Sequence, residues 1–227
     1  MDKLSMTDST IGFIGLGLIG GSIAKGIKRS RPDIKIMAYM RSRSRLEQAK
    51  REGIVDVILD GIDEHLRECD LIFLCTPVEY NAGYLSAIRP FLKQGALITD
   101  VGSTKQGIHQ EIICQELTHC FVGGHPMAGS EKTGYENSTD HLLENAYYIV
   151  TPPRGCDPSG STSLSENDRR IIAVAHTIGA IPLVLDYREH DKVVAAISHL
   201  PHLVASSLVN LIKDHDTADG TMKQVAA

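Results

Sequence analysis

The sequence contains no tryptophan and few other aromatic residues, with seven tyrosines and four phenylalanines among 227 residues. Proteins that bind single-stranded nucleic acid stack the bases on aromatic side chains, so this mode of binding is not expected. The sequence also lacks an excess of positive charge, because its formal net charge is −5. A basic surface is what attracts nucleic acid or an anionic membrane. We therefore expect neither as a partner.

Cysteine is scarce as well, and the five cysteines form no C-x-x-C pair. An odd number without this spacing suits neither a disulfide framework nor a zinc site, so we expect reduced thiols and no metal. The beginning of the sequence has no basic segment followed by an apolar one, and we identify no run of the ~18 apolar residues that a bilayer-spanning helix requires. These absences predict a globular protein of the cytoplasm.

What the sequence does contain is a regular alternation of strand-like and helix-like segments. Short β-branched, apolar runs alternate with segments that carry apolar residues at helical spacing. This order predicts an α/β protein of Rossmann type, with a doubly wound, mainly parallel sheet and helices on both faces. The expected strands cover 10–14, 34–39, 55–59, 71–75, 96–100, 120–123, 147–151 and 181–185, the expected helices 18–27, 45–52, 104–117 and 167–178, and a mobile surface loop rich in Pro, Gly and Ser 152–165.

The last part of the sequence differs in character. Asp186 is a candidate N-cap for a long helix from about residue 189 to 212, which Pro201 should kink or interrupt. No apolar partner for this helix follows it. We therefore expect a dinucleotide-binding Rossmann domain over 1–186 and the start of an all-α, helical substrate and dimerisation domain over 187–227, apparently truncated.

A glycine motif lies at the first expected turn from strand to helix. Gly15-x-Gly17-x-x-Gly20 follows a strand and opens a helix, as in dinucleotide-binding folds. Gly15 would permit the tight turn, Gly17 the approach of a pyrophosphate and Gly20 close helix–sheet packing, while the helix N-terminus offers free N–H groups. We predict that a nicotinamide dinucleotide binds at Gly15, Gly17, Leu18, Ile19 and Gly20.

The end of the second expected strand bears on the choice between NAD and NADP. NAD sites usually have an acidic residue there, but Met40 occupies the position and Arg41, Ser42 and Arg43 follow it. These side chains could hold a 2′-phosphate through charge-assisted hydrogen bonds, or could form a solvated helix start. Arg41 and Ser42 are therefore candidate cofactor contacts, and the cofactor is NAD or NADP.

Polar segments follow the fourth and fifth expected strands, at the sheet edge where ligands of open α/β folds bind. Thr76, Pro77 and Val78 follow the fourth strand, and Ser103 follows the fifth. We predict that these residues line the nicotinamide pocket. Ser103 could also cap the helix that begins near Thr104.

Three histidines are candidates for chemistry. His125 lies in a glycine-bounded segment that we expect to be a flexible, polar turn at a strand end, and hydride loss from an alcohol needs a base that titrates near neutrality. His199 and His202 would share one helix face. No carboxylate or cysteine lies at a companion spacing, so substrate contact or core packing is favoured over metal binding. The other histidines are interpreted as surface residues: His65, His109, His119, His141, His176, His190 and His215.

Four motifs together resemble those of the prephenate dehydrogenase family, monofunctional type: IGFIGLGLIGGS, DVGSTK, GGHPMAGSEKTG and VVAAISHLPHLVA. The resemblance implies oxidative decarboxylation of prephenate to 4-hydroxyphenylpyruvate, with hydride transfer to NAD(P), in tyrosine biosynthesis. It implies that His125 is the base, that Ser103 orients the hydroxyl and the nicotinamide, and that the full-length protein forms a homodimer through its helical region. The residues that it assigns to substrate contact are Ser130, Glu131, His199 and His202.

The resemblance also has a gap, and other interpretations stay open. The family continues with a G-G-F-[KR]-D-x-T-R stretch whose arginine binds a substrate carboxylate, and the sequence does not contain it. We therefore expect cofactor binding with poor turnover. One alternative is an arogenate dehydrogenase, and another is a β-hydroxyacid dehydrogenase with Lys192 as its catalytic lysine. A third is a non-catalytic dinucleotide sensor, in which His125 would be dispensable.

Overall fold

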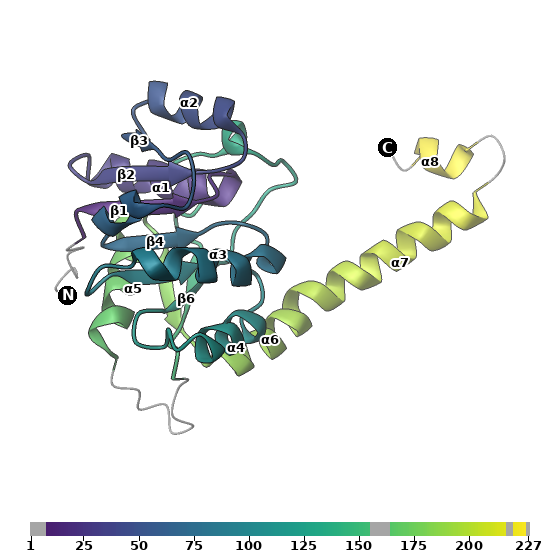
Figure 1. Ribbon diagram of the computed structural model, residues 1–227. Helices are drawn as coiled ribbons and strands as arrows, with labels where there is room; N and C mark the ends of the chain where they lie inside the picture. Colours follow the sequence, from purple (N-terminus) through teal and green to yellow (C-terminus); the bar gives the residue numbers. More distant parts are fainter. Residues whose placement is uncertain (1–7, 155–163, 217–219, 226–227) are drawn as a thin grey trace.

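The computed structural model describes residues 8–154, 164–216 and 220–225 (Figure 1). The central segment of the expected loop at 152–165 lies outside these residues. Five parallel strands form one sheet in the order β3-β2-β1-β4-β5. They are β1 (Thr10–Ile14), β2 (Lys35–Tyr39), β3 (Val57–Ile58), β4 (Leu71–Leu74) and β5 (Leu97–Asp100).

A three-stranded sheet continues from this one in the order β6-β7-β8. Its strands are β6 (Gly123–Pro126), β7 (Tyr147–Thr151) and β8 (Ile181–Val184). β6 and β7 are antiparallel, β7 and β8 are parallel, and a parallel bridge between Ile98 and Phe121 connects the two sheets. The prediction of a mainly parallel, Rossmann-type sheet is confirmed. β6, however, begins where the expected strand at 120–123 was to end.

Alternation along the central strands gives the sheet two buried faces. In β4, Leu71 and Phe73 pack into one core cluster, while Ile72 and Leu74 pack into the other. Helices α1 and α5 cover the first face and helices α3 and α4 the second. Each fully buried apolar side chain contributes roughly 1.5–3 kcal/mol. The helices of the body are α1 (Leu18–Ser30), α2 (Arg43–Arg51), α3 (Asn81–Ile88), α4 (Gln106–Cys114) and α5 (Glu166–Thr177), with single 3₁₀ turns at 64–68, 78–80, 89–91 and 135–137.

The last helices run as one continuous rod away from the body (Figure 1). The rod comprises α6 (Tyr187–Val194), a π-helical turn (Ala195–His199) and α7 (Leu200–His215), and the short α8 (Thr221–Val225) follows. The Asp186 side chain accepts a hydrogen bond of 2.8 Å from the Arg188 N–H, which confirms its capping role. Pro201 interrupts the α-helix through the π-helical turn just before it, because proline lacks an N–H and its ring crowds the carbonyl four residues earlier.

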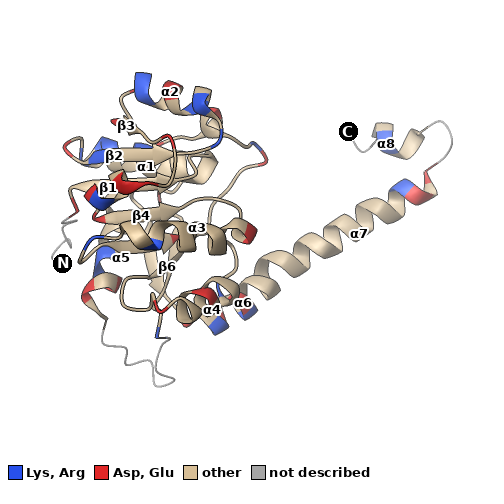
Figure 2. Cartoon of the chain, in the orientation of Figure 1, with Lys and Arg blue, Asp and Glu red and all other residues tan. Residues whose placement is uncertain are grey.

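The rod exposes apolar side chains almost everywhere and carries few charges along α7 (Figure 2). By length and composition alone it qualifies as a helix that could cross a membrane, with a mean hydropathy of 1.3 in its apolar window and 6% of that window buried. The expectation that no such run exists was therefore wrong. The large apolar residues that the rod exposes are Val193, Ile197, Leu200, Leu203, Val204, Leu208, Val209, Leu211 and Ile212.

Candidate active site

The glycine turn between β1 and α1 has the geometry that a dinucleotide requires. Gly15 has a φ of +91°, and a Cβ added there would lie 2.8 Å from the Cys75 carbonyl oxygen. A Cβ on Gly20 would lie 2.7 Å from the Gly15 carbonyl oxygen, whereas one on Gly17 would meet no atom within 4 Å. Gly17 is the N-cap of α1 and no side chain caps the helix. The turn thus leaves open space in front of free N–H groups, which fits a pyrophosphate.

Two arginines in the segment after β2, Arg41 and Arg43, make different contacts. Arg43 forms ion pairs with Asp60 and Glu47, so it belongs to a solvated helix start. Arg41 is exposed and lies over the Tyr80 ring, 5.7 Å from the ring centroid, with no carboxylate partner among the described residues. Ser42 is the N-cap of α2 but makes no side-chain cap bond. Arg41 and Ser42 stay candidate contacts for a ribose or its phosphate, and the Ser42 hydroxyl lies within hydrogen-bond distance of the Ser44 hydroxyl, at 3.3 Å.

The loops after β4 and β5 lie side by side at the carboxyl edge of the sheet. The Thr76 hydroxyl donates to Asn81 Oδ1 at 2.9 Å, and Pro77 leads into the 3₁₀ turn that begins at Val78. A Cβ added to Gly102 would lie 2.7 Å from the Val78 side chain, so the two loops are in contact. This is the edge where a bound nicotinamide would project.

A cavity of about 280 Å³ at this edge brings together three predicted site residues, Ser103, His125 and His199. It does not include the other three residues predicted to contact the substrate. His202 is exposed on α7, and Ser130 and Glu131 are exposed in the loop after β6, 3.2 Å apart in a hydrogen bond with each other. The remaining residues that line the cavity are Pro126, Met127, Ala128, Gly129, Val194 and Ser198.

His125 lies within strand β6, opposite Ile149 of β7, and not in a flexible turn. Burial, aided by the nearby Lys105 charge, lowers the pKa of its imidazole to about 3. The expectation that His125 titrates near neutrality was therefore wrong for this structure, in which the ring is neutral at physiological pH and carries a lone pair on one nitrogen. The glycines before it suggested a turn, but pairing with β7 makes the segment a strand.

His125 is hydrogen-bonded to a histidine that the sequence analysis placed on the surface. His125 Nδ1 lies 2.8 Å from His190 Nε2, and His190 Nδ1 lies 2.7 Å from Asp191 Oδ1. His190 is fully buried. A helical signal was available, because Tyr187, His190 and Val194 follow at spacings of three and four residues and are the buried positions of α6. His109, also predicted on the surface, is fully buried and stacks on Tyr187 with centroids 4.2 Å apart.

Asp191 also caps the N-terminus of helix α4, a role that the sequence suggested for Ser103. Its carboxylate accepts hydrogen bonds from the Lys105 N–H at 2.7 Å and the Gln106 N–H at 2.9 Å, at the N-terminus of α4. Ser103 makes no such cap and lines the cavity instead. Beneath this junction Lys105 and Asp100 form a fully buried ion pair, which the sequence analysis missed.

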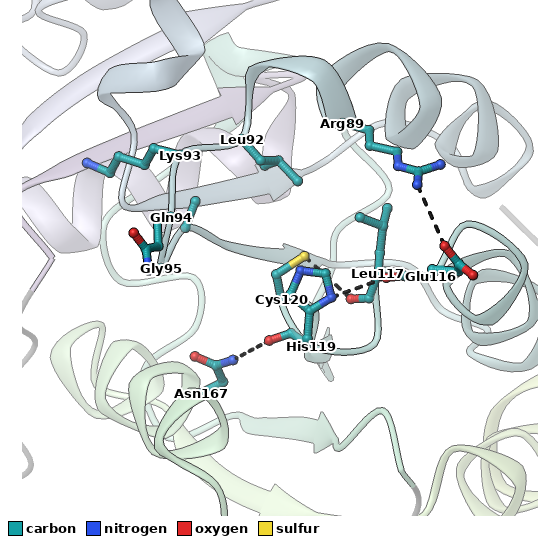
Figure 3. Close-up of a pocket in the computed structure, with 11 residues that line it drawn as sticks. Arg89, Leu92, Lys93, Gln94, Gly95, Glu116, Leu117, His119, Cys120 and Asn167 are labelled. Atoms are coloured by element: carbon teal, nitrogen blue, oxygen red, sulfur yellow. Dashed lines mark hydrogen bonds and ion pairs between the residues drawn. The ribbon is translucent and has the colours of Figure 1, made fainter.

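A larger cavity, of about 530 Å³, lies elsewhere (Figure 3). It is bounded by the segments that lead into β5 and β6, at the amino-terminal edge of the strands. Its polar groups bond to one another: Asn167 donates to the His119 carbonyl oxygen at 3.0 Å, and Arg89 pairs with Glu116 at 3.9 Å. Size therefore does not identify the site.

No cluster of three metal-binding side chains occurs in the described residues, and the described cysteines are free: Cys69, Cys75, Cys114 and Cys120. Cys156 lies outside the described residues.

Comparison with known proteins accounts for both parts of the chain. Residues 23–167 match the nucleotide-binding domain of prephenate dehydrogenase, and residues 186–227 match its dimerization domain. Prephenate dehydrogenase of Lactococcus lactis is 38% identical over 94% of this chain and 57% of its own length, and that of Bacillus subtilis is 36% identical over 99% and 59%. The chain thus spans less than two thirds of these relatives.

Solved structures agree with this assignment. Prephenate dehydrogenase of Aquifex aeolicus, in complex with hydroxyphenyl propionate and NAD⁺, is 30% identical with a TM-score of 0.82, over 93% of this chain and 72% of that one. Synechocystis arogenate dehydrogenase is also 30% identical, with a TM-score of 0.77, over 96% and 74%. The nucleotide-binding turn, the histidine in its strand and these matches lead to one conclusion: the chain belongs to the prephenate dehydrogenase family.

Proposed function

We propose that this protein oxidises prephenate to 4-hydroxyphenylpyruvate and carbon dioxide with NAD or NADP. The observation that carries the proposal is the cavity in which Ser103, His125 and His199 converge at the carboxyl edge of the sheet. The substrate's hydroxyl proton would pass to His125 while the ring carbon gives hydride to the nicotinamide. The ring carboxylate would then leave as carbon dioxide, the electron pair of its carbon–carbon bond would aromatise the ring, and the phenolate oxygen would take the proton back. Arogenate, which has an amine in place of the keto group, is the alternative substrate.

The residues of the glycine turn would hold the cofactor. The N–H groups at the start of α1 would donate to the pyrophosphate, and Gly17 leaves the space that it needs. Thr76, Pro77 and Val78 would lie against the nicotinamide, which supplies the hydride acceptor when bound. Because aromatisation of the ring drives the reaction, the protein needs mainly to align the reactants and receive a proton.

Three side chains would act on the substrate. The neutral His125 would accept the hydroxyl proton, and Ser103, which lines the same cavity, would orient the hydroxyl. His199 lies at the end of the π-helical turn and would contact the substrate's side chain or ring carboxylate. Removing a general base typically lowers turnover ~10²–10⁴-fold.

The test is the absorbance of the reduced cofactor when the protein is mixed with prephenate or arogenate, each with NAD and with NADP. We expect turnover with at least one pair, and its loss in His125→Asn with cofactor affinity unchanged. Cofactor binding without turnover of either substrate would contradict the proposal and would favour a dinucleotide sensor.

We further propose that the apolar face of α7 packs against a second copy of the chain. Leu203 and Val209 are 63% and 64% exposed, and the match to a dimerization domain supports a protein partner for them. Burial of apolar area contributes roughly 25 cal/mol per Å². Light scattering should give a dimer, and Leu208→Asp should shift it towards monomer. A monomeric parent protein that sediments with lipid vesicles would contradict this and would favour a membrane.

A further inference from the structure

A chain of three hydrogen-bonded side chains crosses from the long helical rod to the sheet. It runs from Asp191 and His190 on α6 to His125 on β6, with separations of 2.7 and 2.8 Å. His190 is fully buried and His125 is 9% exposed. Three of the four ring nitrogens, His125 Nδ1 and both nitrogens of His190, therefore have a protein partner in place of water, and that partner sets their protonation.

Asp191 determines the direction of the first hydrogen bond. Its oxygens already accept from the Lys105 and Gln106 N–H groups. Burial acts to raise the pKa of this carboxyl, but the hydrogen bonds from Gln106, His190 and Lys105 outweigh it and lower the pKa. An ionised carboxylate can only accept hydrogen bonds. His190 must therefore donate to it through Nδ1–H.

The second hydrogen bond follows from the first. Burial lowers the pKa of His190, so its ring is neutral and carries a single N–H. With that proton on Nδ1, His190 Nε2 is an acceptor. His125 must then donate through its own Nδ1–H, which leaves the lone pair on His125 Nε2. This nitrogen has no hydrogen-bond partner among the described residues, and His125 lines the cavity.

We propose that His190 and Asp191 are positioning residues that hold His125 in the tautomer whose Nε2 lone pair is available to the substrate. The inference rests on the proposed function, in which His125 is the base. In the reaction the substrate O–H bond breaks and an N–H bond forms at His125 Nε2, and after carbon dioxide leaves the proton returns to the phenolate oxygen. The His125 Nδ1–H then keeps its bond to His190, and the positive charge of the ring faces an acceptor anchored on a carboxylate.

The tautomer can be measured without substrate. In protein labelled with ¹⁵N-histidine, the nitrogen chemical shifts should show His125 protonated at Nδ1. His190→Leu removes the acceptor, so His125 should revert to the Nε2-protonated form that neutral histidine favours in water. His190→Gln places an amide oxygen near the position of Nε2 and should restore the Nδ1-protonated form. An Nε2-protonated His125 in the parent protein would overturn the proposal.

Turnover gives the second readout. His190→Leu should lower kcat ~10²-fold, at the lower end of what a general base contributes, with KM for the substrate and the affinity for cofactor unchanged. His190→Gln should recover most of that loss. Unchanged kcat in the leucine variant, or equal losses in both, would overturn a positioning role.

A matched control is His109→Gln. His109 is also a fully buried histidine, but it does not take part in the hydrogen bonds that link Asp191, His190 and His125. It tests the cost of altering a buried histidine as such, and it should leave both the His125 tautomer and kcat as in the parent. If the parent oxidises neither prephenate nor arogenate, the proposed function fails, and the nitrogen shifts still decide the proposal.

Discussion

The two halves of the site are built in different ways. The cofactor turn consists of main-chain atoms within six residues, Gly15 to Gly20, and needs glycines because side chains would clash with the backbone or fill the ligand's space. The catalytic edge consists of side chains, and the hydrogen bond from His125 to His190 joins residues 65 positions apart. A site formed by main-chain atoms can be predicted from a short sequence motif. A site formed by side chains that are distant in the sequence can be predicted only when the whole fold is known.

The largest effect should come from the catalytic half. His125→Asn should lower turnover roughly 10²–10⁴-fold, because it removes the proton acceptor, and should leave cofactor affinity unchanged. Steady-state kinetics and titration of cofactor fluorescence would measure the two quantities. A parallel loss of cofactor affinity would mean that the halves are not independent.

Low pH should destabilise the fold through buried histidines at and near the catalytic edge, since the glycine turn has no titratable side chain. Burial lowers the pKa of His109 and His125 to about 3 and lowers that of His190. The unfolded chain protonates its histidines near pH 6.5. Below that pH the unfolded state binds more protons, so the free energy of unfolding should fall as pH decreases. The slope should reach about 1.4 kcal/mol per pH unit for each of His109 and His125, and His190 adds to the fall in the same direction.

Denaturant titrations at pH 7, 6 and 5 would measure this slope. His109→Gln should make it shallower, because one of the three titrating groups is gone. A free energy of unfolding that is constant over this range would contradict the burial of these rings.

The glycine turn must adopt a positive φ at Gly15 and leave space for a pyrophosphate at Gly17, and two substitutions would test these requirements separately. Gly15→Ala should destabilise the fold by about 1–3 kcal/mol, because alanine is strained at a φ of +91°. Gly17→Ala should leave the thermal midpoint unchanged, since its Cβ meets no protein atom, and should weaken cofactor binding by about tenfold or more, equivalent to ~1.4 kcal/mol. Unchanged cofactor affinity in Gly17→Ala would place the pyrophosphate elsewhere.

The smallest effect concerns the choice of cofactor. Arg41 is exposed without a carboxylate partner in the described part of the chain. If it binds a 2′-phosphate, Arg41→Ala should weaken NADP binding by roughly tenfold and leave NAD binding unchanged. Arg43→Ala is the matched control, because Arg43 is held by Asp60 and Glu47. Equal effects of Arg41→Ala on both cofactors would remove it from this selection.

Local patterns predicted most of the fold, and the errors have physical reasons. Strands β1, β2 and β4 follow from apolar, β-branched runs that are buried on both faces. Helix α3 was missed because Gly83 lies in its middle and its apolar positions are poorly periodic. The location of His125 in a strand depends on pairing with β7, which the glycines beside it obscure.

The catalytic edge was predictable only in part. Ser103, His125 and His199 were identified from strand ends and motifs, and the structure brings them together. His190 and Asp191 were not, because α4 is capped by a residue 85 positions away from Gln106 and no short motif records such a contact. The helical spacing of His190 with Tyr187 and Val194 could have marked it as buried, but the prediction placed it on the surface. The roles of these residues stay predictions.

The hydrogen-bonded chain has a consequence for anyone who exchanges parts between members of this family. The predicted division at residue 186 separates His125 from His190 and Asp191, so a chimera joined there would combine one parent's base with another's supporting carboxylate. A join beyond Val194, the last residue of α6, keeps all three from one parent. By this reasoning, the segment that should come from one parent is the Rossmann domain together with helix α6.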